Sequence, residues 1–230
     1  MGNPATALPL PAIEIPGYGK LSLAPQPNPP LLMVFGGIDV PEGQLDPTDK
    51  SHAKDMVHSG VYMWNYFNRL KSRFHIFVAL TPKVNGAMAY RHVLSALQSK
   101  SSAPGGHPSG QPQAFGGPYQ VLYLFSGGYK PGSELLASYS VKLFSSIFLV
   151  DIWMGSEGVG SYYQHLVTAN AGKTYYIHTS FGANNSKVRD AISKKLGGTR
   201  AILVKGTGNE TGMQTHLRTN EEAVARIPLN

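Results

Sequence analysis

Residues 119–128 read YQVLYLFSGG, an apolar run that ends on a serine and is followed by two glycines. The run of Val, Leu, Tyr and Phe predicts a buried strand over residues 119–125. A serine at the carboxyl end of a central strand, with nothing bulky after it, can be held exposed at the rim of a sheet. Ser126 is therefore a candidate nucleophile, provided that the chain offers a base and an acid at matching places.

Apolar runs and segments with helical periodicity alternate on both sides of this stretch. The expected strands are a hairpin over residues 13–24 and the runs 31–35, 74–80, 119–125, 147–151, 174–179 and 201–205. The expected helices cover residues 59–71, 86–98, 133–143, about 160–169, 186–196 and a last segment from Thr219, where Thr219 and Glu222 fit a capping box, to Pro228. This alternation predicts α/β architecture: a three-layer α/β/α sandwich with a mostly parallel sheet and an N-terminal antiparallel hairpin.

The length of 230 residues predicts one domain over residues 1–230. Residues 1–12 are expected to form an extended tail. The segment 101–118 is rich in Gly, Pro, Ser and Gln, which predicts a flexible loop just before the strand that carries Ser126.

The composition excludes several kinds of site. The chain has no cysteine, so disulfides, Cys-ligated zinc and a cysteine nucleophile are excluded for this sequence. Whether Ser126 stands in the place of a native cysteine is left open. The histidines show no metal-ligand spacing, Gly36-Gly37 is not part of G-x-G-x-x-G, and no G-x-x-x-x-G-K-[ST] occurs. We therefore expect neither a metal nor an organic cofactor.

The net charge of +7 permits attraction to anionic partners. The basic residues are scattered, however, and no arginine-rich run marks a nucleic-acid module, so no nucleic-acid partner is expected. No apolar stretch approaches the roughly 20 residues of a membrane span, and residues 1–11 lack the features of a signal peptide. We expect a soluble protein, cytoplasmic by default, and the sequence leaves compartment and oligomeric state open.

Four positions follow directly after predicted strands, where parallel sheets gather functional residues. They are Gly36-Gly37-Ile38-Asp39, Ser126-Gly127-Gly128, Asp151 and the loop 206–218, which holds His216. The order of these features along the chain resembles that of the α/β-hydrolase family. A hairpin comes first, followed by a strand with a Gly-Gly exit and a serine on the third parallel strand. An acid and then a histidine before the last helix complete the order. The resemblance spans residues 13–228.

The resemblance implies that Ser126 is the nucleophile and His216 its base. It also implies an oxyanion hole built from the backbone N–H of Gly127 and that of Gly37 or Ile38. Two features depart from the family pattern G-x-S-x-G: position 124 is Leu, and Lys130-Pro131-Gly132 puts several residues between Ser126 and the expected helix.

The acid has more than one candidate. Asp151 closes an apolar strand, and a carboxylate there is costly to bury unless it is paired, which a histidine partner would explain. Glu157 in the following loop is the reserve, and Asn184 could serve only to orient the base. We further expect Asp39, Trp64 and Tyr129 to contact substrate.

The predicted activity is that of a serine hydrolase, in which an acyl-enzyme forms on Ser126 during cleavage of a carboxylic ester or amide. The partner would be a small-molecule or acyl substrate. A non-catalytic α/β binding module, in which the same glycines only turn the chain, is the alternative from another class. A third reading is a peptidase or amidase acting on cell-wall peptide, suggested by the basic surface.

Overall fold

The computed structural model describes residues 12–26, 28–36, 67–79, 83–101, 119–180, 186–208 and 212–228. Its strands form one eight-stranded sheet in the order β1-β2-β4-β3-β5-β6-β7-β8. The strands are β1 (Ala12–Ile15), β2 (Gly19–Ser22), β3 (Leu31–Phe35), β4 (His75–Ala79), β5 (Gln120–Phe125), β6 (Ser146–Val150), β7 (Thr174–Thr179) and β8 (Ala201–Val204). Strand β2 pairs antiparallel with β1 and β4, and every other neighbouring pair is parallel.

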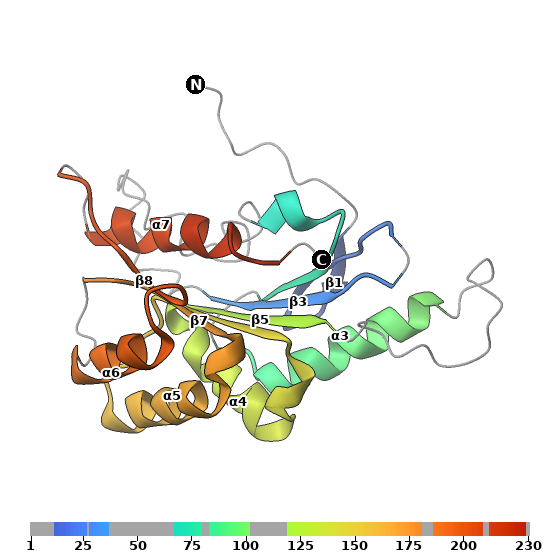
Figure 1. The fold of residues 1–230 in the computed structure, drawn as a ribbon. Coiled ribbons are helices and arrows are strands. Elements are labelled where there is room, and N and C mark those ends of the chain that lie inside the picture. Colours follow the sequence, from blue (N-terminus) through green and yellow to red (C-terminus); the bar gives the residue numbers. More distant parts are fainter. Residues whose placement is uncertain are drawn as a thin grey trace, which may run out of the picture.

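Helices cover both faces of this sheet (Figure 1). They are α3 (Gly86–Ser101), α4 (Tyr129–Ser138), α5 (Glu157–Asn170), α6 (Ser186–Leu196) and α7 (Gly212–Val224). Helices α3 to α6 lie on one face and α7 lies on the other. The fold is thus the predicted three-layer α/β/α sandwich, with a mostly parallel sheet and an antiparallel hairpin at its N-terminal edge.

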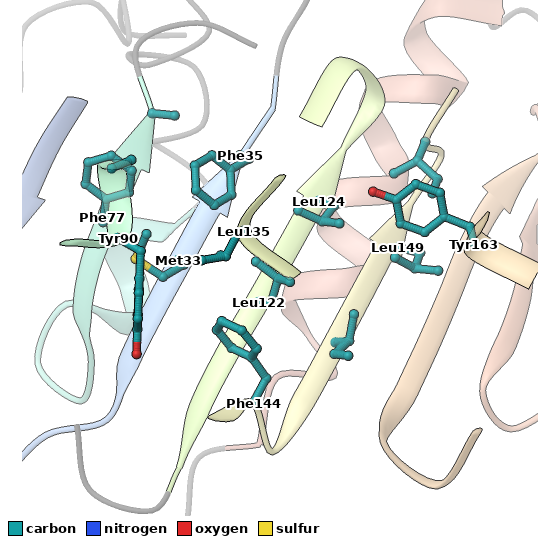
Figure 2. Close-up of a cluster of buried hydrophobic side chains, with 14 of the residues drawn as sticks. Met33, Phe35, Phe77, Tyr90, Leu122, Leu124, Leu135, Phe144, Leu149 and Tyr163 are labelled. Atoms are coloured by element: carbon teal, nitrogen blue, oxygen red, sulfur yellow. The ribbon is translucent and has the colours of Figure 1, made fainter. Parts of the chain in front are cut away.

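The central strands β3, β5 and β6 are almost wholly apolar because both of their faces are buried. Alternate side chains enter two separate cores. The core under α3 to α6 is partly drawn in Figure 2, which labels Met33, Phe35, Phe77, Tyr90, Leu122, Leu124, Leu135, Phe144, Leu149 and Tyr163. The core under α7 contains Val34, Tyr123, Phe148 and Leu217. Burial of one such side chain stabilises the fold by about 1.5–3 kcal/mol, so the strand order is strongly specified.

Helices α4 and α7 begin at least four residues earlier than the sequence predicts. Helix α4 begins at Tyr129 rather than residue 133, because Pro131 lies in its first turn, where a missing N–H costs nothing. Helix α7 begins at Gly212 rather than Thr219. The predicted capping box at Thr219 is therefore wrong: Thr219 lies inside the helix and donates its hydroxyl to the His216 carbonyl at 2.5 Å. The early turns of α7 bury Thr215, which contributes no apolar periodicity.

Several predicted segments lie outside the described residues. They are the tail up to residue 11, the loop 102–118 and most of the expected helix 59–71, of which Asn68–Leu70 forms the short 3-10 turn η2. In the described part of the chain, no helix is both long enough and apolar enough to cross a membrane.

Candidate active site

Ser126 follows β5 directly, in a backbone conformation that is unusual for a residue with a side chain. Its φ is +51°, in the left-handed region that sterically disfavours residues other than glycine. Residues Ser126–Gly128 form the 3-10 turn η3, and α4 begins at the next residue. The expected spacer between the serine and the helix is therefore absent. The result is a sharp turn from strand to helix, the geometry that presents a serine at the top of a sheet.

Gly128 lets this turn approach the end of β3. A Cβ built on Gly128 would lie 2.7 Å from the carbonyl carbon of Phe35, closer still to its oxygen, and 3.2 Å from the Gly36 nitrogen. A Cβ on Gly36 would in turn lie 3.2 Å from the Phe125 Cβ. The exit of β3 and the turn after β5 thus touch through backbone atoms, so position 128 requires glycine.

Gly132 explains how leucine is accommodated at position 124. A Cβ on Gly132 would lie 2.6 Å from the Leu124 Cδ2, and Leu124 itself is fully buried. The small residue that allows the helix to pack on the strand is supplied by α4 instead of β5. The segment Lys130-Pro131-Gly132, which the family pattern suggests is a spacer, is thus part of α4 and contains the small residue.

Asp151 follows β6 and also has a positive φ, of +41°. Its amide donates to the Ile177 carbonyl at 2.7 Å. Its carboxylate accepts from the Thr179 amide at 3.0 Å and from the Thr179 hydroxyl at 2.8 Å. The side chain is buried, and such a carboxylate is tolerated only when its lone pairs are used. Thr179, on β7, is a partner that the sequence analysis did not identify.

His216 supplies the third hydrogen bond to Asp151. Its Nδ1 lies 2.6 Å from Asp151 Oδ2, and its side chain is 16% exposed. An ionised carboxylate only accepts hydrogen bonds, so Nδ1 donates and Nε2 of the neutral ring is left as an acceptor. His216 lies in the second turn of α7, not in a loop before the last helix as predicted.

The imidazole of His216 also lies against the strand that carries the serine. It stacks on Phe125 with ring centroids 4.6 Å apart and an interplanar angle of 26°. Phe125 is the residue directly before Ser126. The Trp153 amide donates to the Ser126 carbonyl at 3.2 Å, which ties the turn after β6 to the turn after β5. The backbone of Ser126, the carboxylate of Asp151 and the imidazole of His216 therefore lie at the same carboxyl edge of the sheet, linked through Trp153 and Phe125.

A second histidine, His178, lies near this set but on the opposite face of β7 from Thr179. It is buried and stacks on Tyr176 at 4.6 Å. Burial is the main cause that lowers its pKa, while Asp151 and the Thr179 carbonyl act in the opposite direction. We therefore expect His178 to stay neutral near pH 7. Among the described residues, no three His, Asp or Glu side chains gather as they would around a metal ion.

The remaining predicted residues divide into two groups. Tyr129 is the first residue of α4, and its ring lies 5.4 Å from that of Trp153. Glu157 is the exposed first residue of α5. Outside the described residues lie Gly37, Ile38, Asp39, Trp64 and Asn184. Trp153 was not singled out from the sequence, although an aromatic residue two positions after the acid was a visible signal.

Comparisons with known proteins add a loose structural likeness. No family model and no curated protein sequence matches the chain. Among solved structures, the chain is similar to Est1E from Butyrivibrio proteoclasticus, at 13% identity and a TM-score of 0.43, with 93% of this chain and 94% of that chain covered. Because this likeness is so loose, the fold assignment rests on the strand order and register.

Proposed function

We propose that the protein is a serine hydrolase that cleaves a carboxylic ester or amide through an acyl-enzyme on Ser126. The observation that carries the proposal is the 2.6 Å hydrogen bond between His216 Nδ1 and Asp151 Oδ2. It orients the imidazole and leaves Nε2 to act as a base, while the ring stacks on the residue that precedes the serine.

In the proposed reaction, Ser126 Oγ attacks the carbonyl carbon while His216 Nε2 takes the hydroxyl proton. The same proton is then delivered to the leaving alcohol or amine. Water, activated by His216, attacks the acyl-enzyme and releases the acid. Asp151 stays ionised throughout and stabilises the imidazolium that forms in each half-reaction.

The negative charge that develops on the carbonyl oxygen needs donors nearby. The amide of Gly127, next to the nucleophile, is the first proposed donor. The second is Gly37 or Ile38, because the preceding residue, Gly36, lies against the Ser126 turn. One such donor contributes about 3 kcal/mol to stabilisation of the transition state.

Backbone strain supports a functional role for both turns. Ser126 and Asp151 occupy the left-handed region at the ends of adjacent strands. Each costs on the order of 1–2 kcal/mol relative to an ordinary conformation. Strain of this kind gathers at active sites, where it positions a reactive group. A turn with no task beyond reversing the chain would be built more stably with glycine or asparagine at these positions.

The proposal is tested by labelling with a fluorophosphonate, which reacts with activated serines. The wild-type protein is expected to be labelled, and Ser126→Ala is expected to abolish labelling. Ser133→Ala is the matched control, because Ser133 lies in α4 and its hydroxyl only donates to the Lys130 carbonyl. Absence of labelling at high protein concentration would favour the non-catalytic binding module instead.

Hydrolysis of p-nitrophenyl acetate separates the roles of the other two residues. We expect Asp151→Asn to lower kcat by about 10⁴-fold, because the imidazole loses its orienting anion. His216→Asn is expected to lower it at least as much, since the base itself is removed. Parallel assays with p-nitroanilides address bond type: cleavage of esters without any cleavage of amides would argue against the peptidase or amidase reading.

A further inference from the structure

An exposed tryptophan lies beside the proposed nucleophile. Among the described residues, the large apolar side chains that remain exposed are Met88, Leu143, Trp153 and Leu203. Only Trp153, which is 42% exposed, is bonded to the candidate site, through its amide and the Ser126 carbonyl at 3.2 Å. The exposed indole is therefore available to contact a ligand bound at the candidate site.

The indole is held in place by its neighbours. Its ring centroid lies 5.4 Å from that of Tyr129, at an interplanar angle of 41°. A Cβ built on Gly155 would lie 2.6 Å from the indole Cζ2 and 2.9 Å from Nε1. The indole therefore lies directly over the backbone of Gly155, a position that a larger residue would not allow.

Tyr129 is anchored as well. Its carbonyl oxygen accepts from the Tyr163 hydroxyl at 2.5 Å, and Tyr163 is fully buried beneath α4. Tyr129 begins the helix that follows the Ser126 turn. Two aromatic rings are thus held together, one after the serine and one after the acid. A pair of rings on rigid supports contributes contact area at little cost in conformational entropy.

Three kinds of ligand bind exposed aromatic pairs: cations, sugars and aromatic rings. A cation is disfavoured by the protein's net charge of +7. A sugar needs hydrogen-bond partners for its hydroxyls, whereas the contacts that position the indole are with the ring of Tyr129 and the backbone of Gly155. A planar aromatic ring can pack on the faces of Trp153 and Tyr129 and gains offset or edge-to-face contacts there.

We propose that Trp153 and Tyr129 bind an aromatic ring of the substrate, so that the preferred substrate class is an ester or amide with an aryl group near the scissile bond. This inference rests on the proposed hydrolase function. The ring would pack on Trp153 while the carbonyl carbon reaches Ser126.

Kinetics with matched esters test this preference. Methyl phenylacetate and methyl cyclohexylacetate differ only in whether the ring on the acyl side is aromatic. Benzyl acetate and cyclohexylmethyl acetate make the same comparison on the alcohol side. We expect a higher kcat/KM for the aromatic member of at least one pair, and we expect Trp153→Ala to reduce that aromatic-to-saturated ratio by about 10-fold, equivalent to about 1.4 kcal/mol.

Two further variants serve as controls for the effect of Trp153→Ala on the aromatic-to-saturated ratio. Gly155→Ala, which displaces the indole without removing it, is expected to reduce the ratio in the same direction. Leu143→Ala removes an exposed apolar side chain before β6, at the opposite edge of the sheet, and is expected to leave the ratio unchanged. An equal effect of Trp153→Ala on aromatic and saturated esters would overturn the proposal, as would an equal loss in Leu143→Ala.

A binding measurement keeps this inference separate from the hydrolase proposal. The chain has two tryptophans, so Trp153 is the only one left in the double variant Trp64→Phe, Ser126→Ala. We expect phenylacetamide to change its fluorescence at lower concentration than cyclohexylacetamide or methyl glucoside. Equal responses, or a stronger response to the glucoside, would reject the aromatic site. If the wild-type protein takes up fluorophosphonate but shows no aromatic preference, this inference fails and the hydrolase proposal stands.

Discussion

The turn after β5 and the turn after β6 each begin with a non-glycine residue at positive φ, Ser126 at +51° and Asp151 at +41°. The first turn is held by close packing: Gly128 contacts the Phe35 carbonyl and Gly132 contacts Leu124. The second is held by hydrogen bonds, from Thr179 and from the amide of residue 151 to the Ile177 carbonyl.

The difference follows from what each side chain is proposed to do. A nucleophile must keep its hydroxyl available, so its position is set by the backbone packed around it. A carboxylate that orients an imidazole can be fixed through its own oxygens, and Asp151 accepts from both Thr179 and His216. Adding one atom to a closely packed contact causes a steric clash and a large loss of stability. Removing one hydrogen bond from a group that has several lowers the free energy of unfolding only by the contribution of that bond.

The largest effect is expected from Gly128→Ala. The φ of Gly128 is −63°, which alanine adopts readily, so any loss comes from the clash with Phe35. Backbone cannot move aside cheaply, and we expect the free energy of unfolding to fall by about 3 kcal/mol or more. Urea denaturation measures the loss. Gly158→Ala is the control, because nothing lies within 4 Å of a Cβ at that helical position. Equal stability of the two variants would contradict the packing account.

Gly132→Ala is expected to cost about 2 kcal/mol, because the new methyl group meets the Leu124 side chain. The stronger test is a double-mutant cycle. In a Leu124→Ala background the methyl group fills part of the space vacated by leucine, so the second change should cost at least about 1 kcal/mol less than it does alone. Additive losses in urea denaturation would show that positions 124 and 132 do not compensate each other.

Thr179→Val probes the hydrogen-bonded turn. Valine keeps the shape of threonine and the amide bond to Asp151 Oδ1, but it removes the hydroxyl donor to Oδ2. Loss of a bond to a charged group should lower the free energy of unfolding by about 1.5 kcal/mol. Fluorophosphonate labelling of Ser126 should slow, since the anion beside His216 is less well held. Thr168→Val, on α5, is the control, and matching changes in both variants would speak against a special role for Thr179.

The smallest expected effect is the difference in stability between two variants that both lack the Ser126 hydroxyl. Both Ser126→Ala and Ser126→Gly remove the hydroxyl, but only glycine adopts a φ near +51° without a steric penalty. We expect Ser126→Gly to be about 1 kcal/mol more stable than Ser126→Ala. Thermal and urea unfolding of the two variants make the comparison, and equal stability would mean that the turn relaxes when the side chain is changed.

The sheet was predictable because its strands are buried on both faces, so that β5 and β6 are apolar at every position after the first. Helix starts were less predictable. Pro131 and Gly132 suggest a loop, but their segment belongs to α4. In the first turns of α7 a polar residue, Thr215, occupies a buried position, so the apolar periodicity that would indicate a helix is missing there. The roles of Ser126 and His216 stay predictions.

The pattern of residues along the chain determined the layers, the parallel strands and the placement of Ser126 and Asp151 at strand ends. Tertiary structure decided how those ends are held: Gly132 accommodates Leu124, Thr179 braces Asp151, and Trp153 packs on Tyr129. The reason is physical. Periodicity records which face of one element is buried, whereas these contacts depend on distances between different elements, which no spacing along a single segment encodes.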